Sequence, residues 1–248
     1  HNSRYARRNT MKRLGHFDDI LLVGHRGTGK TTLGRKLGDA LDAELVDLDE
    51  RIEGAAGETC AEIIARSESE FRQLERDHLR AVLDEDTTRP RIITPGAGLQ
   101  HIPEGPLCVW LWRDGWEQTA RAERARLRPQ MEWSEEVDWM RTSREPRWAR
   151  AAHLRFDIPH GRLVEFQAKM LADYILWAQQ AHASEVTKRT WFVPSSDDQL
   201  QRAARDARSL GAAGVEVRSD LVDDTIDLDD AVDVMVSLRT DNPEWLGM

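Results

Sequence analysis

Apolar and polar residues along the chain follow two alternating patterns. Short, mainly apolar runs, typical of strands buried in a parallel sheet, lie at 20–23, 43–49, 91–94, 107–112 and 154–158. Between them apolar residues recur at helical spacing, in stretches at 31–41, 59–83, 139–152 and 163–183. Strands that alternate with helices form a parallel sheet with helices on both faces. We therefore predict an α/β fold for residues 18–183.

A glycine-rich segment follows the first apolar run. Residues 24–31 fit the pattern Gly-x-x-x-x-Gly-Lys-Thr, with a predicted strand before them and a predicted helix after them. This context predicts a P-loop, in which Lys30 holds the β- and γ-phosphates of a nucleoside triphosphate and the Thr31 hydroxyl ligates Mg²⁺. The alternative is a glycine-rich turn without a ligand. The predicted nucleotide-binding residues of the loop are Gly24, Gly27, Gly29, Lys30, Thr31 and Thr32.

Two carboxylates stand at the end of the second run. Asp47 and Asp49 lie two residues apart, so on a strand spanning 43–49 their side chains point to the same face. Beside a P-loop, Asp47 is suited to hold Mg²⁺ through water and Asp49 to accept a proton from an attacking alcohol. The alternative for Asp49 is a helix cap, since it precedes Glu50.

Arginines and a second glycine-bearing loop supply further candidate chemistry. Arg72, in the helical stretch 59–83, can bind a carboxylate with two hydrogen bonds, or can be an ordinary salt-bridged residue. Gly96, Ala97 and Gly98 follow a predicted strand, in a loop where backbone amides can approach a ligand. Residues 113–131 are rich in arginine, which suits a mobile lid over a triphosphate or, equally, a solvated helix.

The overall charge is acidic and unevenly distributed. The net charge is −9, and residues 185–248 carry 14 acidic and 7 basic side chains, so this segment alone contributes −7. We therefore expect no direct binding to nucleic acid. Two cysteines and no long apolar run predict a reducing, cytoplasmic setting with no membrane contact.

Taken together, these motifs resemble the shikimate kinase family over roughly residues 18–180. The resemblance implies ATP and Mg²⁺ as cofactors, shikimate as substrate, Asp49 as the base that contacts the shikimate hydroxyls, and Lys30 with Arg128 as phosphate-binding catalytic groups. It also implies that Arg72 and Arg144 bind the shikimate carboxylate, that Arg121 lies near the adenine, and that Thr31 and Asp47 hold the metal.

Two places depart from the family pattern: the lid continues as Pro129-Gln130-Met131 where the family usually has apolar residues, and the substrate loop differs more seriously. The substrate loop of the family reads Gly-Gly-Gly, whereas this chain has Gly96-Ala97-Gly98. If the central position requires a positive φ or bare backbone against the substrate ring, the Ala97 methyl weakens or abolishes binding. This departure makes a catalytically inactive member of the family an open alternative.

The last part of the chain predicts a separate segment. Strands at 189–193 and 214–218, with helices at 197–210 and 230–238, indicate a βαβ segment over 184–248 that resembles the start of a type I 3-dehydroquinate dehydratase. The alternative is an unrelated βαβ appendage. We predict three parts: a flexible basic arm (1–17), the kinase-like P-loop domain (18–183) and this segment (184–248).

Shikimate kinase followed by such a dehydratase is the order in the fungal pentafunctional arom polypeptide and in the quinate repressor. Two hypotheses follow for a small-molecule site of the shikimate or quinate class. The first is an enzyme that transfers the ATP γ-phosphate to the 3-hydroxyl of shikimate. The second is a non-catalytic sensor domain of a transcriptional repressor, with a protein partner and a nuclear location. A kinase for a different hydroxylated acid is a third, weaker hypothesis.

Overall fold

The computed structural model describes residues 19–123, 128, 130–183, 191–193, 202–207, 214–218 and 233–237. Within them, eight parallel strands form one sheet in the order β2-β3-β1-β4-β5-β6-β7-β8. The strands are β1 (Asp19–Val23), β2 (Glu44–Asp47), β3 (Arg91–Thr94), β4 (Leu107–Trp112), β5 (Leu154–Asp157), β6 (Trp191–Val193), β7 (Gly214–Arg218) and β8 (Asp233–Ser237). The predicted parallel α/β fold is confirmed.

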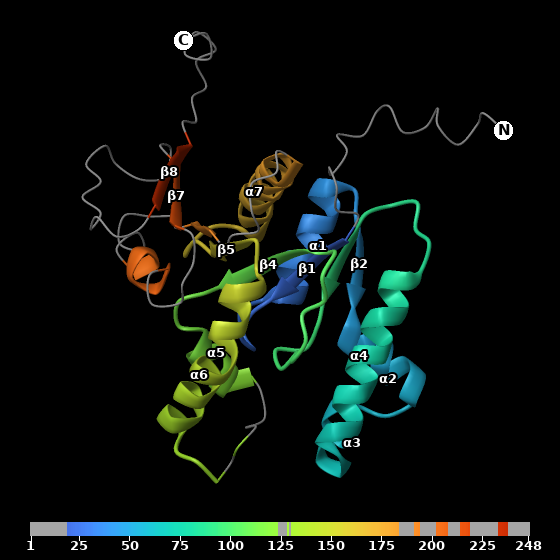
Figure 1. Ribbon diagram of the computed structural model, residues 1–248. Coiled ribbons are helices and arrows are strands. Elements are labelled where there is room, and N and C mark those ends of the chain that lie inside the picture. Colours follow the sequence, from blue (N-terminus) through green and yellow to red (C-terminus); the bar gives the residue numbers. More distant parts are fainter. Residues whose placement is uncertain are drawn as a thin grey trace, which may run out of the picture.

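Helices cover both faces of this sheet (Figure 1). They are α1 (Lys30–Leu41), α2 (Leu48–Ala56), α3 (Cys60–Arg66), α4 (Glu68–Asp84), α5 (Trp116–Glu123), α6 (Trp133–Ala151) and α7 (Val164–Ala183). Helices α1 and α7 lie together on one face, while α4 and α6 lie on the other. None of the helices in the described part of the chain is long and apolar enough to cross a bilayer.

Strand β4 shows why the sheet needs two helical layers. All six of its residues are buried, and their side chains alternate between two cores. Leu107, Val109 and Leu111 join the core under α1 and α7, whereas Trp110 and Trp112 join the core under α4 and α6. A strand buried on both faces reads as a continuous apolar run, which is the pattern seen in the sequence.

The order of the strands fixes where a ligand can bind. Strand β1 pairs with β3 on one side and with β4 on the other, so the chain direction across the sheet reverses at β1. Loops diverge at such a point and leave a crevice at the carboxyl ends of the strands. The glycine-rich segment that follows β1 lies at this crevice.

Several predicted boundaries are wrong. Asp49 is not on a strand, because β2 ends at Asp47 and α2 begins at Leu48. The single helix predicted for 59–83 is two helices, since Ser67 caps the start of α4 by accepting a hydrogen bond from the Glu70 amide. Helix α6 begins at Trp133, six residues before the predicted start at 139.

The C-terminal segment continues the same sheet. Strand β6 pairs in parallel with β5, and β7 with β6, so the predicted β–α–β order is present, with residues 202–207 as the described part of its helix. The helix predicted at 230–238 is wrong, because Asp233–Ser237 form β8 beside β7. The alternating valines of β8 fit a strand period of two residues.

The described part of this segment also shares a core with the rest of the chain. Ala203, Ala204, Ala207 and Val215 are buried in the cluster that contains Trp110 and Trp112. The predicted arm, residues 1–17, lies outside the described residues. The division at residue 183 stays a prediction.

Candidate active site

The P-loop is folded around its own lysine. Gly27 and Gly29 have φ angles of 80° and 87°, which side-chain-bearing residues rarely adopt. Lys30 Nζ donates to the carbonyl oxygens of Gly24 and His25, each at 3.1 Å. Lys30 therefore lies at the mouth of the loop, at the N-terminus of α1, where backbone N–H groups favour an anion.

The loop is also packed tightly from behind. A Cβ atom on Gly24 would lie 2.6 Å from the carbonyl oxygen of Leu111 in β4, and one on Gly27 would lie 2.9 Å from the amide nitrogen of Ala120 in α5. Arg113 donates from Nε to the Thr28 carbonyl at 3.1 Å. Backbone contacts of this kind leave room only for glycine at both positions.

Thr31 and Asp47 meet beside Lys30. The Thr31 hydroxyl donates to Asp47 Oδ2 at 2.8 Å, while Asp47 Oδ1 accepts from the amides of Asp49 and Glu50 at 3.1 and 3.4 Å. Asp47, and not Asp49, is thus the cap of α2. A hydroxyl and a carboxylate beside a phosphate-binding loop are hard oxygen ligands of the kind Mg²⁺ prefers.

Asp49 lies in the first turn of α2 and faces the second loop. Burial, reinforced by the neighbouring charge of Asp47, raises the pKa of Asp49, although Lys30 opposes this shift. Its Oδ1 atom is buried without a hydrogen-bond partner among the described residues. The same atom lies 3.1 Å from where a Cβ on Gly96 would be, so only glycine leaves this carboxylate open to a ligand.

Arg72 closes the other side of this loop. Its Nη1 donates to Glu75 Oε2 at 2.9 Å, and a Cβ on Gly98 would lie 2.5 Å from its Nη2. Glu75 is only 1% exposed, and burial raises the pKa of its carboxyl despite the opposing charge of Arg72. Glu75 therefore fixes the direction of the guanidinium along the loop backbone.

Arg144 adds a second buried cation to the same place. It is 4% exposed, and its Nη1 has no hydrogen-bond partner in the described part of the chain. Burial, followed by the like charge of Arg72, lowers the pKa of Arg144 to about 10. Two guanidinium groups close enough to repel one another are suited to bind a carboxylate, and the predicted carboxylate-binding role of Arg72 and Arg144 stays a prediction.

Comparison with known proteins agrees with this geometry. The family model described as shikimate kinase matches residues 26–162, which is more than half of the chain. The chain belongs to the shikimate kinase family.

Individual relatives support the same assignment. Shikimate kinase from Rhodopirellula baltica is 34% identical over 168 residues, which cover 61% of this chain and 88% of that protein. Shikimate kinase structures from Bacteroides thetaiotaomicron (25% identity, TM-score 0.54) and from Acinetobacter baumannii in complex with shikimate (27% identity, TM-score 0.52) align with 63% and 69% of this chain. Those matches cover 97% and 96% of the two structures. The chain is therefore a shikimate kinase-like phosphotransferase.

The segment predicted to form a lid, residues 113–131, contains helix α5 and ends just before α6. Arg121 is exposed in the last turn of α5, one residue after the amide that lies against Gly27. The Arg128 guanidinium lies over the Trp139 ring at 4.1 Å, and Arg144 approaches the same ring at 5.4 Å. The roles predicted for Arg121 and Arg128 stay predictions, and residues 124–127 and 129 lie outside the described part.

Ala97 adopts a backbone conformation that alanine tolerates. Among the described residues only Asp42 combines a side chain with a positive φ angle, so Ala97 has none. The close approaches to charged side chains occur at Gly96 and Gly98, the two positions where glycine is kept. Of the two conditions stated for the central position, a positive φ is therefore not required here.

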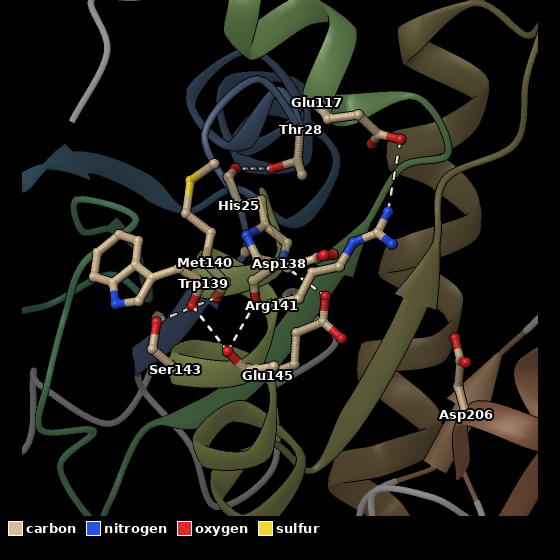
Figure 2. A network of polar contacts seen from close by, with 12 residues as sticks. His25, Thr28, Glu117, Asp138, Trp139, Met140, Arg141, Ser143, Glu145 and Asp206 are labelled. Atoms are coloured by element: carbon tan, nitrogen blue, oxygen red, sulfur yellow. Dashed lines mark hydrogen bonds and ion pairs between the residues drawn. The ribbon is translucent and has the colours of Figure 1, made fainter. Parts of the chain in front are cut away.

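Four residues near the site were not predicted from the sequence. Glu75 orients Arg72, and Arg113 contacts the P-loop at the Thr28 carbonyl. The buried His25 and the half-buried Glu145 form a pair between the P-loop and α6, with Nε2 and Oε1 2.8 Å apart (Figure 2). A histidine inside a P-loop was a visible signal, but Glu145 is 120 residues away in sequence and nothing local pointed to it.

Proposed function

We propose that this protein transfers the γ-phosphate of ATP to the 3-hydroxyl of shikimate. The observation that supports this most is the placement of Asp49. Its half-buried carboxylate, whose Oδ1 has no hydrogen-bond partner among the described residues, lies against the Gly96 loop and near the charges of Lys30 and Arg72. Phosphoryl transfer needs mainly positioning and charge stabilisation, and this arrangement offers both.

Each predicted residue takes one role in this proposal. Asp49 accepts the proton from the attacking hydroxyl, and its raised pKa makes it a stronger base than an exposed aspartate. Arg72 and Arg144 hold the carboxylate of the acceptor and so fix which hydroxyl faces the nucleotide. Gly96, Ala97 and Gly98 lie along the ring of the acceptor. Lys30 and the lid residue Arg128 bind the transferred phosphate, and Arg121 lies at the adenine end.

Thr31 and Asp47 are proposed to hold Mg²⁺, Asp47 through water. Their hydroxyl and carboxylate oxygens are already adjacent, which fits a hard divalent cation. When bound, the ion neutralises charge on the β- and γ-phosphate oxygens. The loop residues Gly24, Gly27, Gly29 and Thr32 complete the proposed nucleotide site.

The C-terminal resemblance remains a separate hypothesis. If residues 184–248 are the start of a dehydratase, the chain has the domain order of the arom polypeptide and of the quinate repressor. The second case implies a sensor function, a protein partner and a nuclear location. Ala97 and the unusual lid sequence Pro129-Gln130-Met131 were the features that favoured a sensor, and the absence of a positive φ at Ala97 weakens the first of them. We therefore favour the enzyme, in a cytoplasmic setting.

A coupled ADP-release assay with shikimate, quinate and other hydroxylated acids tests the proposal, alongside calorimetric titration with each acid and with Mg²⁺ plus a non-hydrolysable ATP analogue. Shikimate-dependent ADP release is expected. Binding of nucleotide or acid without turnover would instead identify a sensor. Turnover only with another acid would keep the phosphotransferase and change its substrate.

A further inference from the structure

The P-loop histidine points away from the proposed phosphate site and into the core. His25 is fully buried, and its ring stacks on Trp116 of α5 with centroids 3.8 Å apart and an angle of 5° between planes. Trp112 and Trp148 approach the ring at 6.1 and 4.7 Å, both at 74°. Its position is therefore fixed by aromatic packing on several sides.

The backbone of His25 carries the contacts that shape the loop. Its carbonyl oxygen accepts from Lys30 Nζ at 3.1 Å, from the Thr28 hydroxyl at 2.8 Å and from the Thr28 amide at 3.3 Å. Any displacement of the His25 side chain therefore shifts the partners of the phosphate-binding lysine.

The side chain of His25 reaches helix α6. Its Nε2 lies 2.8 Å from Glu145 Oε1, and Figure 2 shows the two side chains facing one another across the space between the P-loop and α6. Glu145 follows Arg144 directly in α6. One turn of α6 thus places Arg144 near Arg72, which lies against the substrate loop, and Glu145 against His25 of the P-loop.

A second link ties α6 to α5. Arg141, one turn before Glu145, pairs with Glu117 of α5 at 3.6 Å, as Figure 2 also shows. Helix α5 lies against Gly27 of the P-loop. The P-loop, α5 and α6 are therefore joined pairwise by specific contacts.

The protonation of the pair follows from its surroundings. Burial, together with the charges of Arg144, Lys30, Arg141 and Arg155, holds the pKa of His25 well below its ordinary value. A neutral ring with hydrogen on Nε2 donates to Glu145 and leaves only a lone pair at Nδ1, which has no hydrogen-bond partner among the described residues. The opposite tautomer would bury an unpaired N–H.

We propose that His25 and Glu145 are positioning residues that couple the nucleotide site to the acceptor site by locking the P-loop to the α6 turn that carries Arg144. This inference rests on the proposed function and assigns it two further residues. Neither side chain contacts the reacting atoms. Both act by keeping Lys30 and Arg144 at fixed positions relative to one another.

Calorimetry with Mg·ADP, together with steady-state kinetics, tests the coupling. His25→Leu and Glu145→Leu are each expected to raise the Kd for Mg·ADP and the KM for shikimate about tenfold, and the double variant to do no worse than either single one. Glu145→Gln keeps an acceptor for Nε2–H and is expected to retain most of the affinity.

Asp19→Asn serves as the matched control. Asp19 accepts two hydrogen bonds from the buried Arg91 at the opposite end of β1, at 2.6 and 2.9 Å. This variant is expected to lose stability in urea without any change in Kd or KM. If the His25 and Glu145 variants behave like this control, the pair is merely structural and the inference is wrong.

A measurement on the unmodified protein covers the case in which the leucine variants fail to fold. Binding of Mg·ADP is expected to slow backbone hydrogen exchange in α6 around Glu145. Absence of that protection, with nucleotide bound, overturns the coupling. A wild-type protein that binds neither Mg·ADP nor shikimate would instead contradict the proposed function itself.

Discussion

At the scale of single residues, the surroundings of a side chain decide its chemistry. Asp47 and Asp49 are two residues apart and chemically identical, yet Asp47 caps a helix and accepts a hydrogen bond from Thr31, while Asp49 keeps an oxygen open toward Gly96. The sequence offered both as acids beside a P-loop. The end of β2 at Asp47 decided which of the two caps the helix.

Asp49→Asn should lower kcat/KM for shikimate by a factor of about 10² to 10⁴, the usual range for loss of a general base. Because an asparagine side chain has nearly the same shape as that of aspartate, the Kd for Mg·ADP should change little. In the wild-type protein, the raised pKa of Asp49 places the acid limb of the kcat/KM profile above the ordinary aspartate value of 3.8. A variant with unchanged kcat/KM contradicts the role of Asp49.

The substrate loop gives a second prediction at this scale. Gly98→Ala places a methyl group against the Arg72 guanidinium and should raise the KM for shikimate about tenfold. Ala97→Gly should change it by less than about twofold, because Ala97 already has an ordinary backbone conformation. Steady-state kinetics of the two variants side by side compares neighbouring positions in one loop. A large gain of affinity in Ala97→Gly would restore the sensor hypothesis.

At the scale of elements, helix α6 brings together groups that the sequence keeps apart. Its turn around Arg144 and Glu145 faces both the substrate loop and the P-loop, and Arg141 reaches α5. Glu145 is 15% exposed at its side chain, and burial raises its pKa to about 7. Arg155, Arg141 and Arg202 oppose this shift, while Asp206 adds to it.

The raised pKa of Glu145 predicts a pH-dependent difference in stability. Between its ordinary pKa of 4.5 and about 7, the folded state holds this proton more tightly than the unfolded state, so the carboxyl destabilises the fold progressively as pH rises. Glu145→Gln does not titrate. Its free energy of unfolding relative to wild type should therefore increase by on the order of 2 kcal/mol from pH 4.5 to 7. Urea titrations of both proteins across this pH range measure the difference in free energy of unfolding. A difference that does not change with pH argues against the raised pKa of Glu145.

At the scale of the whole molecule, a buried ionic group joins the family domain to the C-terminal segment. Arg155 in β5 is fully buried and donates to Asp157 at 2.7 Å and to Asp206, in the 202–207 helix, at 2.8 Å. Its guanidinium lies 4.6 Å from the Trp112 ring. Arg202 pairs with Asp114 at 2.5 Å nearby. These contacts bind the described part of the segment to the sheet.

Asp206→Ala should lower the free energy of unfolding by about 1–3 kcal/mol, because it removes a carboxylate that compensates the buried Arg155 guanidinium. Asp39→Ala is the control: Asp39 is 73% exposed in a surface ion pair with Lys36, and its loss should cost less than about 0.5 kcal/mol. Urea unfolding followed by tryptophan fluorescence compares the two. Equal stability of both variants means that the segment contributes nothing through Asp206.

The sequence by itself determined the parallel α/β fold, the P-loop and the positions of most strands, because each depends on local patterns. Apolar runs mark strands buried on both faces, and Gly24-x-x-x-x-Gly29-Lys30-Thr31 is a contiguous motif. The shift from strand to helix at Leu48 and the strand in place of a helix at 233–237 were missed, since short segments satisfy either period.

Only the tertiary structure decided which groups meet. The approach of Arg72 to Gly98, the pair of Arg72 and Arg144, the His25–Glu145 hydrogen bond and the addition of β6 to β5 all join segments that are distant along the chain. Burial depends on such neighbours, and with it the raised pKa of Asp49 and Glu145. Local sequence fixes which chemistry is available, whereas long-range packing fixes where each group lies and which proton it holds.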